Sequence, residues 1–414
     1  MNTLNRMIAT TAVLLISLVL AACGGGGGGG DGDGGGGGGG SPPPAAGKSW
    51  GTPQLIETYN TGDAAAPQVV FDASGNAVAV WVQFGAAGSY IFANRYVAGS
   101  GWGTPQPVEG NDVGDARGLQ VANDANGNAI AVWAKFDGAR YNIMSNRYTA
   151  GTGWGAPQLI ETNDVGTAGS PQIALDANGN AIAVWSQVLP ALLVGQRVSI
   201  LANRYTVGSG WGTAQPIETD NTGDAFGPQV AFDASGNAIA VWYQNDGTRY
   251  NIMSNRYTAG TGWGTAQRID MDNAWGALDP QVALNPNGNA IAVWRQNDGT
   301  YDSIWANRYT AGTGWGTAQR IETANIQNSS RPQIALDSNG NAIAVWEKFD
   351  SPLHNNIWAN RYTAGTGWGS AQLVETDAGN ATSPYVATDS SGNAIAVWQQ
   401  HDGTRFNIWA NHYR

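Results

Sequence analysis

The heptapeptide Gly236-Asn-Ala-Ile-Ala-Val-Trp242 occurs seven times in the chain, and only the first copy differs, with Val78 in place of the isoleucine. Successive copies end 52, 52, 57, 52, 52 and 52 residues apart. A fixed period of about 50 residues is typical of a repeat architecture rather than of several unrelated domains. The tryptophans that close the copies are Trp81, Trp133, Trp185, Trp242, Trp294, Trp346 and Trp398.

Each repeat has the pattern of four short strands. Around the quoted heptapeptide we expect strands at residues 229–232, 237–243, 250–257 and 263–269, separated by turns rich in Gly, Asn and Asp. The second strand is apolar on both faces, so neighbouring sheets must cover both of them. We therefore predict an all-β fold, a seven-bladed β-propeller of four-stranded antiparallel blades.

The lengths of the connections indicate where one blade ends and the next begins. Connections inside a repeat have hairpin length, whereas the link at residues 219–227 is longer. We therefore expect Pro228-Gln to begin the inner strand of a blade and Gly-Trp-Gly to begin its outer strand. The N-terminal strand, residues 50–57, should then pair with residues 407–414, complete the last blade and close the ring.

The first 49 residues are expected to lie outside the propeller, which spans residues 50–414. Residues 1–22 have the charged start and short apolar run of a signal peptide. The stretch Leu20-Ala-Ala-Cys23 resembles a bacterial lipobox, which implies lipidation of Cys23 and a stable membrane anchor. Residues 23–49, rich in Gly and Pro, should form a disordered tether. Gly24 after the cysteine favours the outer membrane of the cell envelope by the same analogy.

Composition and charge exclude several functions. The formal net charge is −11 and only 12% of residues are charged, which argues against nucleic-acid binding. Cys23 is the single cysteine, and the three histidines lack metal-ligand spacing, so we expect no metal and no cofactor. No nucleophile elbow or isolated carboxylate pair stands out. The sequence therefore predicts a monomeric propeller that is not an enzyme.

Residues present in every repeat are interpreted as structural. The tryptophans of Ala-Val-Trp and of Gly-Trp-Gly should fill the space between blades. The arginine of each Asn-Arg-Tyr should meet the aspartate of the Asp-x-x-Gly-Asn turns at one rim, as Arg256 would meet Asp233. That turn also resembles part of a calcium loop, but we favour a turn stabilised by its own side chains.

Residues that differ between copies are the candidates for binding, and most lie at the opposite rim. Trp275, in the long link before the fifth repeat, is a candidate for stacking on a ligand or for covering a blade edge. The loops before the third strands combine carboxylate, guanidinium and ring, which suits a carbohydrate, although Asp-Gly is also an ordinary hairpin turn. Their residues are Asp137, Arg140 and Tyr141; Asp246, Arg249 and Tyr250; and Asp402 and Arg405. An insertion in the third repeat adds a candidate protein-contact patch of Leu189, Leu192, Leu193 and Val194.

The repeats resemble those of bacterial lipoproteins built from units of about 50 residues with Gly-Trp-Gly and Asn-Ala-x-Ala-Val-Trp. More distantly, the chain resembles the Asp-box propellers of sialidases and the seven-bladed bacterial lectins, although the Ser and Thr of the Asp box are absent. The resemblance implies a lipid-anchored surface or periplasmic protein whose loop rim binds a glycan or an envelope protein. The alternatives are a propeller enzyme of the glycoside hydrolase or lyase type, and a structural scaffold for envelope assembly.

Overall fold

A computed structural model describes the propeller region of the chain. The residues described are 56 and 64–413, apart from short gaps at 73, 75, 86–87, 110–114, 163–164, 191–195, 220–222, 271–274, 323–326, 352–353, 376–378, 390–391 and 402–405. The predicted signal peptide, Cys23 and the predicted tether lie outside these residues. Within them all regular structure is β, and no helix is long and apolar enough to cross a membrane.

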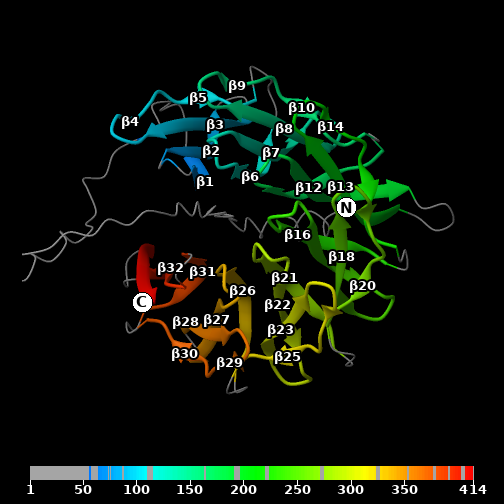
Figure 1. Cartoon of the computed structure of the whole chain (residues 1–414), viewed down its shortest axis with the longest axis vertical. Coiled ribbons are helices and arrows are strands. Elements are labelled where there is room, and N and C mark those ends of the chain that lie inside the picture. Colours follow the sequence, from blue (N-terminus) through cyan, green and yellow to red (C-terminus); the bar gives the residue numbers. More distant parts are fainter. Residues whose placement is uncertain are drawn as a thin grey trace, which may run out of the picture.

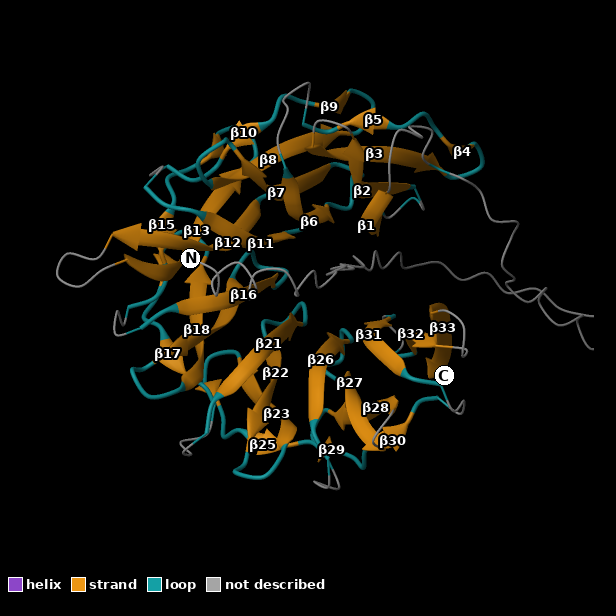
Figure 2. Cartoon of the chain, turned by 180° about the vertical axis from the view of Figure 1, so that it is seen from behind, coloured by secondary structure: helices purple, strands orange, loops and turns teal. Residues whose placement is uncertain are grey.

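Seven antiparallel sheets follow one another around a centre (Figure 1). We number them as blades 1 to 7 in chain order. The innermost strands, which line the centre in both views (Figures 1 and 2), are β1 (Ala64–Phe71), β6 (Ala116–Asn123), β11 (Ala168–Leu175), β16 (Ala225–Phe232), β21 (Ala277–Leu284), β26 (Ser329–Leu336) and β31 (Ala381–Thr388). This arrangement confirms the predicted propeller.

The second and third strands form the body of each blade. The second strands are β2 (Ala77–Gly85), β7 (Ala129–Phe136), β12 (Ala181–Pro190), β17 (Ala238–Asn245), β22 (Ala290–Asn297), β27 (Ala342–Ser351) and β32 (Ala394–His401). The third strands are β3 (Gly88–Val97), β8 (Tyr141–Thr149), β13 (Gln196–Thr206), β18 (Tyr250–Thr258), β23 (Asp302–Thr310), β28 (His354–Thr363) and β33 (Phe406–Tyr413).

The outer strand of blades 1 to 6 is split in two, where one continuous strand was expected. The first pieces are β4 (Gly101–Trp102), β9 (Gly153–Trp154), β14 (Gly210–Trp211), β19 (Gly262–Trp263), β24 (Gly314–Trp315) and β29 (Gly367–Trp368). The second pieces are β5 (Gln106–Pro107), β10 (Gln158–Leu159), β15 (Gln215–Pro216), β20 (Gln267–Arg268), β25 (Gln319–Arg320) and β30 (Gln372–Leu373).

An asparagine side chain causes this interruption. In blade 4 the Nδ2 of Asn255 donates to the Gly264 carbonyl at 3.0 Å, between β19 and β20, and to the Ile217 carbonyl of blade 3 at 2.7 Å. The amide thus replaces a ladder bond of its own blade and ties that blade to the one before. The asparagine of each Asn-Arg-Tyr in blades 1 to 6 makes the same pair of bonds.

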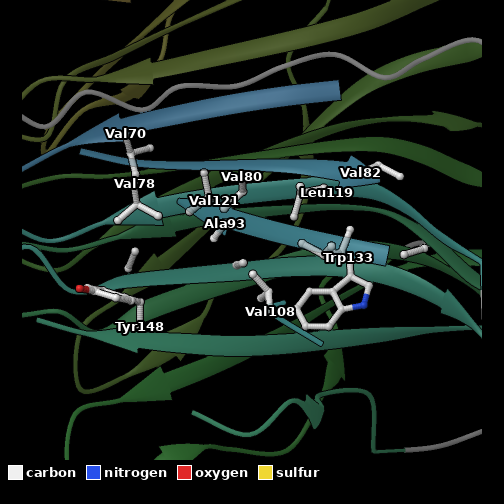
Figure 3. Packing of buried hydrophobic residues seen from close by; sticks show 14 residues of the cluster. Val70, Val78, Val80, Val82, Ala93, Val108, Leu119, Val121, Trp133 and Tyr148 are labelled. Carbon is white, nitrogen blue, oxygen red and sulfur yellow. The ribbon is translucent and has the colours of Figure 1, made fainter. Parts of the chain in front are cut away.

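The repeated heptapeptide forms the second strand, and its two faces belong to two different cores. Trp133 of blade 2 packs against Val80, Val82 and Leu119 in a cluster that blades 1 and 2 share (Figure 3). The Ala-Val-Trp tryptophans are at most 4% exposed, which confirms their role between blades. The six Gly-Trp-Gly tryptophans in the described part of the chain are partly exposed, and all of them except Trp102 pack against the same inter-blade clusters.

The turn after each inner strand is held by its own aspartate, or by Asn285 in blade 5, as predicted. In blade 2 Asp124 Oδ1 accepts the backbone N–H of Asn126 and of Asn128, and Oδ2 accepts the Asn128 amide at 2.7 Å. The expected arginine–aspartate pairs are long, 3.7 Å for Arg95–Asp72 and 3.8 Å for Arg256–Asp233. The arginines instead lie over a tyrosine ring of the next blade, from Arg95 over Tyr148 to Arg361 over Tyr413.

The predicted closure of the ring rests on residues 50–57, of which the structure describes only Ile56. The described Ile56 carbonyl accepts the Nδ2 of Asn94 in blade 1 at 2.8 Å. The equivalent bond in blades 3 and 4 joins Asn255 Nδ2 to the carbonyl of Ile217, which lies at the end of the outer strand of blade 3. Pairing of residues 50–57 with the last blade therefore stays a prediction, and the contact of Ile56 is the one that this prediction requires.

Candidate functional site

The two rims of the propeller carry different connections. One rim, which we call the loop rim, carries the links between blades and the loops between second and third strands. The other, the turn rim, carries the Asp-x-x-Gly-Asn turns and the turns that lead into Gly-Trp-Gly. Propeller strands alternate in direction, so each inner strand starts at the loop rim.

Every inner strand has a bulge at its third residue, near the loop rim. The pairing register shifts there in all seven blades, and the residue has a positive φ. Two blades carry glycine at this residue, but five carry side chains that this backbone disfavours. The five are Ala66 (φ 50°), Ser170 (51°), Asp279 (56°), Arg331 (50°) and Ser383 (55°). The residue at the bulge therefore carries a charged side chain in blades 5 and 6, Asp279 and Arg331.

The residue after the tryptophan of the second strand varies in the same way. It is Tyr243 in blade 4, Arg295 in blade 5 and Glu347 in blade 6, whereas the other blades carry Val82, Ala134, Ser186 and Gln399. In the strand register it lies beside the residue that precedes the bulge, as Arg295 lies opposite Leu278. Three chemically active side chains therefore occupy equivalent places in three consecutive blades.

Arg295 is fixed between two carboxylates. Its Nε donates to Asp279 Oδ2 at 3.1 Å and its Nη1 to Asp302 Oδ2 at 2.7 Å. Burial opposes the charge of the guanidinium, but the two carboxylates outweigh it and raise the pKa of Arg295. Asp302 Oδ1 also accepts the Asn297 amide. Asp279 is 38% exposed, so one carboxylate of the group remains open to a ligand.

Arg331 and Glu347 form a second pair in blade 6. Arg331 Nη1 lies 2.9 Å from Glu347 Oε1, with the arginine side chain 48% exposed and the carboxylate 4% exposed. The same oxygen accepts the backbone N–H of Ser383 in blade 7 at 2.5 Å. A buried carboxylate therefore holds a guanidinium that is about half exposed, near the loop rim.

Aromatic side chains form the wall of the site on the blade 4 side. The rings of Tyr243 and Tyr250 lie 5.3 Å apart edge to face, and Phe226 contacts both. Burial, followed by the negative charge of Asp279, raises the pKa of Tyr243 to about 12. Its phenol is therefore protonated at neutral pH and can donate a hydrogen bond.

Trp275 extends this wall at the loop rim. Its side chain is half exposed, and its Nε1 would lie 2.9 Å from a Cβ placed on Gly299, in the loop of blade 5. A Cβ placed on its neighbour Gly276 would lie 3.7 Å from the backbone N and O of Tyr250, so the link passes beside that residue. The structure thus brings together Trp275 and Tyr250, two residues selected from the sequence, with three that sequence reasoning did not select: Tyr243, Asp279 and Arg295.

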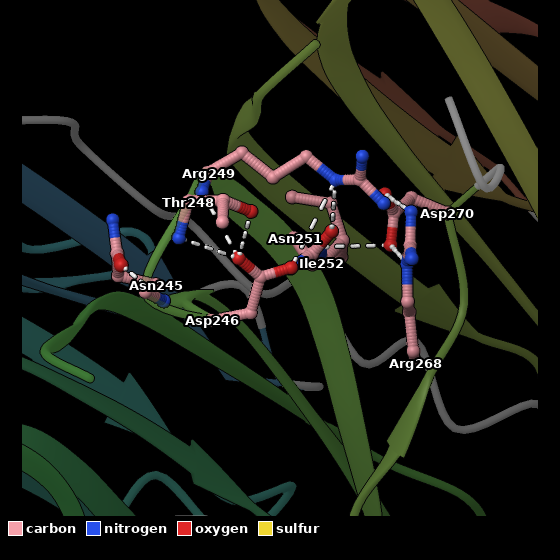
Figure 4. Close-up of polar contacts among 9 residues, drawn as sticks. Asn245, Asp246, Thr248, Arg249, Asn251, Ile252, Arg268 and Asp270 are labelled. Atoms are coloured by element: carbon pink, nitrogen blue, oxygen red, sulfur yellow. Dashed lines mark hydrogen bonds and ion pairs between the residues drawn. The ribbon is translucent and has the colours of Figure 1, made fainter. Parts of the chain in front are cut away.

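The loop of Asp246 is a self-contained turn. Asp246 Oδ1 accepts the N–H and hydroxyl of Thr248 and the N–H of Arg249, and Oδ2 accepts the Asn251 amide. Figure 4 shows the Arg249 side chain running along the loop toward Asp270, with its Nε donating to Asn251. These bonds, that of Thr248 first, lower the pKa of Asp246. The interpretation as an ordinary hairpin turn therefore explains the bonds of the Asp246 carboxylate.

The corresponding loop of blade 2 has the same construction. Asp137 accepts the N–H groups of Ala139 and Arg140, and these bonds lower its pKa to about 2. Tyr141 is covered by the guanidinium of Arg117, whose carbon lies 3.3 Å from the ring centroid. The ring face is therefore already occupied. This loop lies in blade 2, away from the group of Tyr243 and Arg295.

Several candidates fall outside the described residues or have another role. Asp402 and Arg405 lie outside the described residues, as do Leu192, Leu193 and Val194. Leu189 is described and packs, partly buried, against the core between blades 2 and 3, which accounts for its apolar character without a partner. Among the described residues no group of three or more His, Cys, Asp or Glu could hold a metal ion.

Comparison with known proteins identifies relatives of the fold. No family model matches the sequence, and no curated protein matches it. Among solved structures, an ulvan lyase of polysaccharide lyase family 25 has a TM-score of 0.53 at 9% identity, over 82% of this chain and 90% of the lyase. The polysaccharide lyase Uly1 has a TM-score of 0.52 at 9% identity, over 88% and 91%. The NanB sialidase of Streptococcus pneumoniae has a TM-score of 0.43 at 9% identity, over 87% and 70%.

The likeness to the two lyases establishes the propeller fold, and it contradicts the expectation that the chain is not an enzyme. Both are polysaccharide lyases, and they share this fold over 90% and 91% of their length. The sequence argument failed because it sought differences between the copies in the loops and not within the strands. A comparison of the seven copies at the residue after the tryptophan would have revealed Tyr243, Arg295 and Glu347.

Proposed function

We propose that the protein is a carbohydrate-cleaving propeller enzyme of the polysaccharide lyase type, with its site at the loop rim over blades 4 to 6. The observation that carries this proposal is the placement of Tyr243, Asp279, Arg295 and Arg331 in consecutive blades, where other blades carry small or neutral residues. Two of these residues, Asp279 and Arg331, stand at the bulge that every inner strand has, and only in blades 5 and 6 is the bulge residue charged. The two lyases named above have the same fold, which supports elimination over hydrolysis.

The site contains the groups that elimination from an acidic sugar needs. The substrate carboxylate binds the exposed N–H groups of Arg331, a good match for a carboxylate. The Asp279 carboxylate removes the proton from the sugar carbon that bears the substrate carboxylate. The electron pair of that C–H bond forms a carbon–carbon double bond as the glycosidic C–O bond breaks. The protonated phenol of Tyr243 donates its proton to the departing oxygen, so no water or other reactant is consumed.

Arg295 acts as a positioning residue in this scheme. Its bonds to Asp279 and Asp302 orient the base, and its fixed charge stabilises the negative charge that develops on the substrate. Trp275, Tyr250 and Phe226 provide the apolar faces on which sugar rings stack. The half-exposed Trp275 marks the outer end of this surface.

The test is incubation of the protein with acidic polysaccharides, among them ulvan, alginate and pectate. Elimination creates an unsaturated sugar that absorbs in the ultraviolet, whereas hydrolysis creates new reducing ends without that absorbance. We expect absorbance, with a loss of about 100-fold or more in kcat for Asp279→Asn and for Tyr243→Phe. Asp137→Asn, in the turn of blade 2, is the matched control and should retain full activity. Reducing ends without absorbance would replace elimination by hydrolysis, and absence of both would overturn the proposal.

We also propose that the protein is a lipoprotein of the bacterial cell envelope, anchored through Cys23. Support comes from the apolar run before Leu20-Ala-Ala-Cys23 and the glycine-rich segment after it. Growth with a labelled fatty acid should label the protein and place it in the outer-membrane fraction. Cys23→Ser should remove both the label and the membrane association. A wild-type protein without label would contradict this proposal and leave the enzyme proposal untouched.

A further inference from the structure

A groove lies between blades 1 and 2 at the turn rim, on the opposite side from the candidate active site. Its volume is about 480 Å³, and its lining includes Asn94, Arg95, Trp102, Tyr148 and Trp154. Both tryptophans belong to Gly-Trp-Gly motifs and are partly exposed. Tyr148 lies at the end of the shared core opposite Trp133 (Figure 3), so the groove opens where that core ends. A volume of this size is typical of a site for a small ligand.

The groove is close to electrically neutral. Arg95 is its one charged lining residue, and the Nη2 of Arg95 lies 3.7 Å from the Asp72 carboxylate. The guanidinium also lies over the Tyr148 ring, with its carbon 5.2 Å from the centroid. The charge is thus balanced in place and does not require an anion. Ring faces flanked by amide, hydroxyl and guanidinium donors suit a neutral sugar, whose C–H faces stack on rings while its hydroxyls bond to polar groups.

The Trp154 indole N–H in this groove lacks the acceptor that the equivalent tryptophan has in blade 5. In blade 5 the Trp315 indole N–H donates to the Ser254 hydroxyl of blade 4 at 3.2 Å. The residue of blade 1 that corresponds to Ser254 is Ala93, which also lines the groove and has no side-chain acceptor. The Trp154 N–H therefore makes no such bond to blade 1. No serine hydroxyl of that blade competes with a ligand hydroxyl for this donor.

The groove residues recur around the ring. Five successive blade interfaces carry the arginine, the tyrosine of the next blade and the tryptophans of both. Guanidinium–tyrosine distances at these interfaces run from 5.2 to 6.0 Å, and the tyrosine–tryptophan ring distance is 5.6 Å throughout. A ring of equal sites suits a polymer of repeating sugar units, whereas a peptide of irregular sequence would match one interface at most.

We propose that the groove of blades 1 and 2, together with the equivalent positions at the other four interfaces, provides accessory binding sites for neutral saccharide units. They hold a polysaccharide at the turn rim while the loop rim remains free. Each site alone is weak, but simultaneous binding of one chain by several sites raises the affinity through effective concentration. The proposal does not depend on catalysis at the loop rim.

The test is calorimetric titration with cellohexaose, xylohexaose and mannohexaose, together with gel retention on the matching polysaccharides. We expect at least one hexasaccharide to bind with a stoichiometry above one, and its polymer to bind roughly 100-fold more tightly. Thr152→Trp fills the groove from its exposed turn and should remove one site, or weaken retention severalfold. Ala139→Trp, on the loop rim of the same blade, is the matched control and should change neither.

The outcome separates this proposal from the proposed enzyme. Tyr243→Phe and Arg295→Met should leave the hexasaccharide stoichiometry unchanged, because those residues lie at the other rim. A single site that disappears in Arg295→Met would overturn the groove proposal and place all binding at the loop rim. Absence of binding for all three hexasaccharides, or an unchanged stoichiometry in Thr152→Trp, would also overturn it.

Discussion

Replacement of Asn255 by leucine tests the side-chain clamp that joins blades 3 and 4. The Nδ2 of Asn255 is the donor for two carbonyls, of Ile217 at 2.7 Å and of Gly264 at 3.0 Å, and the residue is 2% exposed. Leucine has a similar size but no donor. A buried carbonyl left without a donor costs about 1–3 kcal/mol. The buried Oδ1 of Asn255 has no donor among the described residues. Leucine removes this unsatisfied acceptor, which offsets part of the destabilisation.

The net destabilisation of Asn255→Leu should therefore be about 3 kcal/mol. Unfolding entropy is about 2.1 cal/mol/K per residue, which gives roughly 0.7 kcal/mol/K for a folded body of roughly 350 residues and a fall in Tm of about 4 °C. Scanning calorimetry measures this fall. Asn255→Asp should lower Tm further, because it places a carboxylate against two carbonyl oxygens. Asn126→Leu, in an exposed turn, is the control. A fall below about 1 °C, or an aspartate variant as stable as the leucine variant, would refute the clamp.

Three further predictions concern single contacts. Gln296→Leu removes the acceptor of the buried Trp294 N–H, 2.9 Å away, and should lower the unfolding free energy by about 1–2 kcal/mol, measured by urea denaturation. Gly299→Ala places a Cβ 2.9 Å from the Trp275 indole, which must move, and should lower turnover of polysaccharide. The Tyr243 phenol should titrate near pH 12, and because its pKa is raised in the folded state, its contribution to stability is complete below about pH 10 and disappears as pH rises through 12.

Matched variants make these three predictions decisive. Gly138→Ala carries the same backbone penalty as the Gly299 variant, since φ is +101° against +103°, but its Cβ would meet nothing within 4 Å. Equal activity of the two variants would show that the Trp275 indole is irrelevant. Ultraviolet titration of the wild type minus Tyr243→Phe isolates the phenol, and a midpoint near 10 would show that it is not buried as described. Unchanged urea stability of Gln296→Leu would exclude the indole bond as a stabilising contact.

The repeat period was sufficient to predict the propeller because each copy specifies the same strand. Residues 237–243 were expected as a strand, and β17 runs Ala238–Asn245. The split outer strand could not be predicted, because the cause is a side chain of another strand that bonds to carbonyls of two blades. The charged pairs at the bulges were missed for a similar reason. Residues 279 and 295 are 16 apart in sequence, and only the shifted register of β21 against β22 brings them together.

The placement of the candidate site follows from what a buried charge requires in a fold of identical units. The residue after the tryptophan of the second strand points its side chain at the next blade. Most copies carry an uncharged residue at this position. An arginine or glutamate there costs several kcal/mol unless opposite charge and donors accompany it. Blade 5 supplies Asp279 and Asp302 to Arg295, and blade 6 supplies Arg331 to Glu347. The fold alone does not need these charged residues, because the other blades form with uncharged residues at the same positions. Blades 4 to 6 are accordingly where mutation should separate activity from stability.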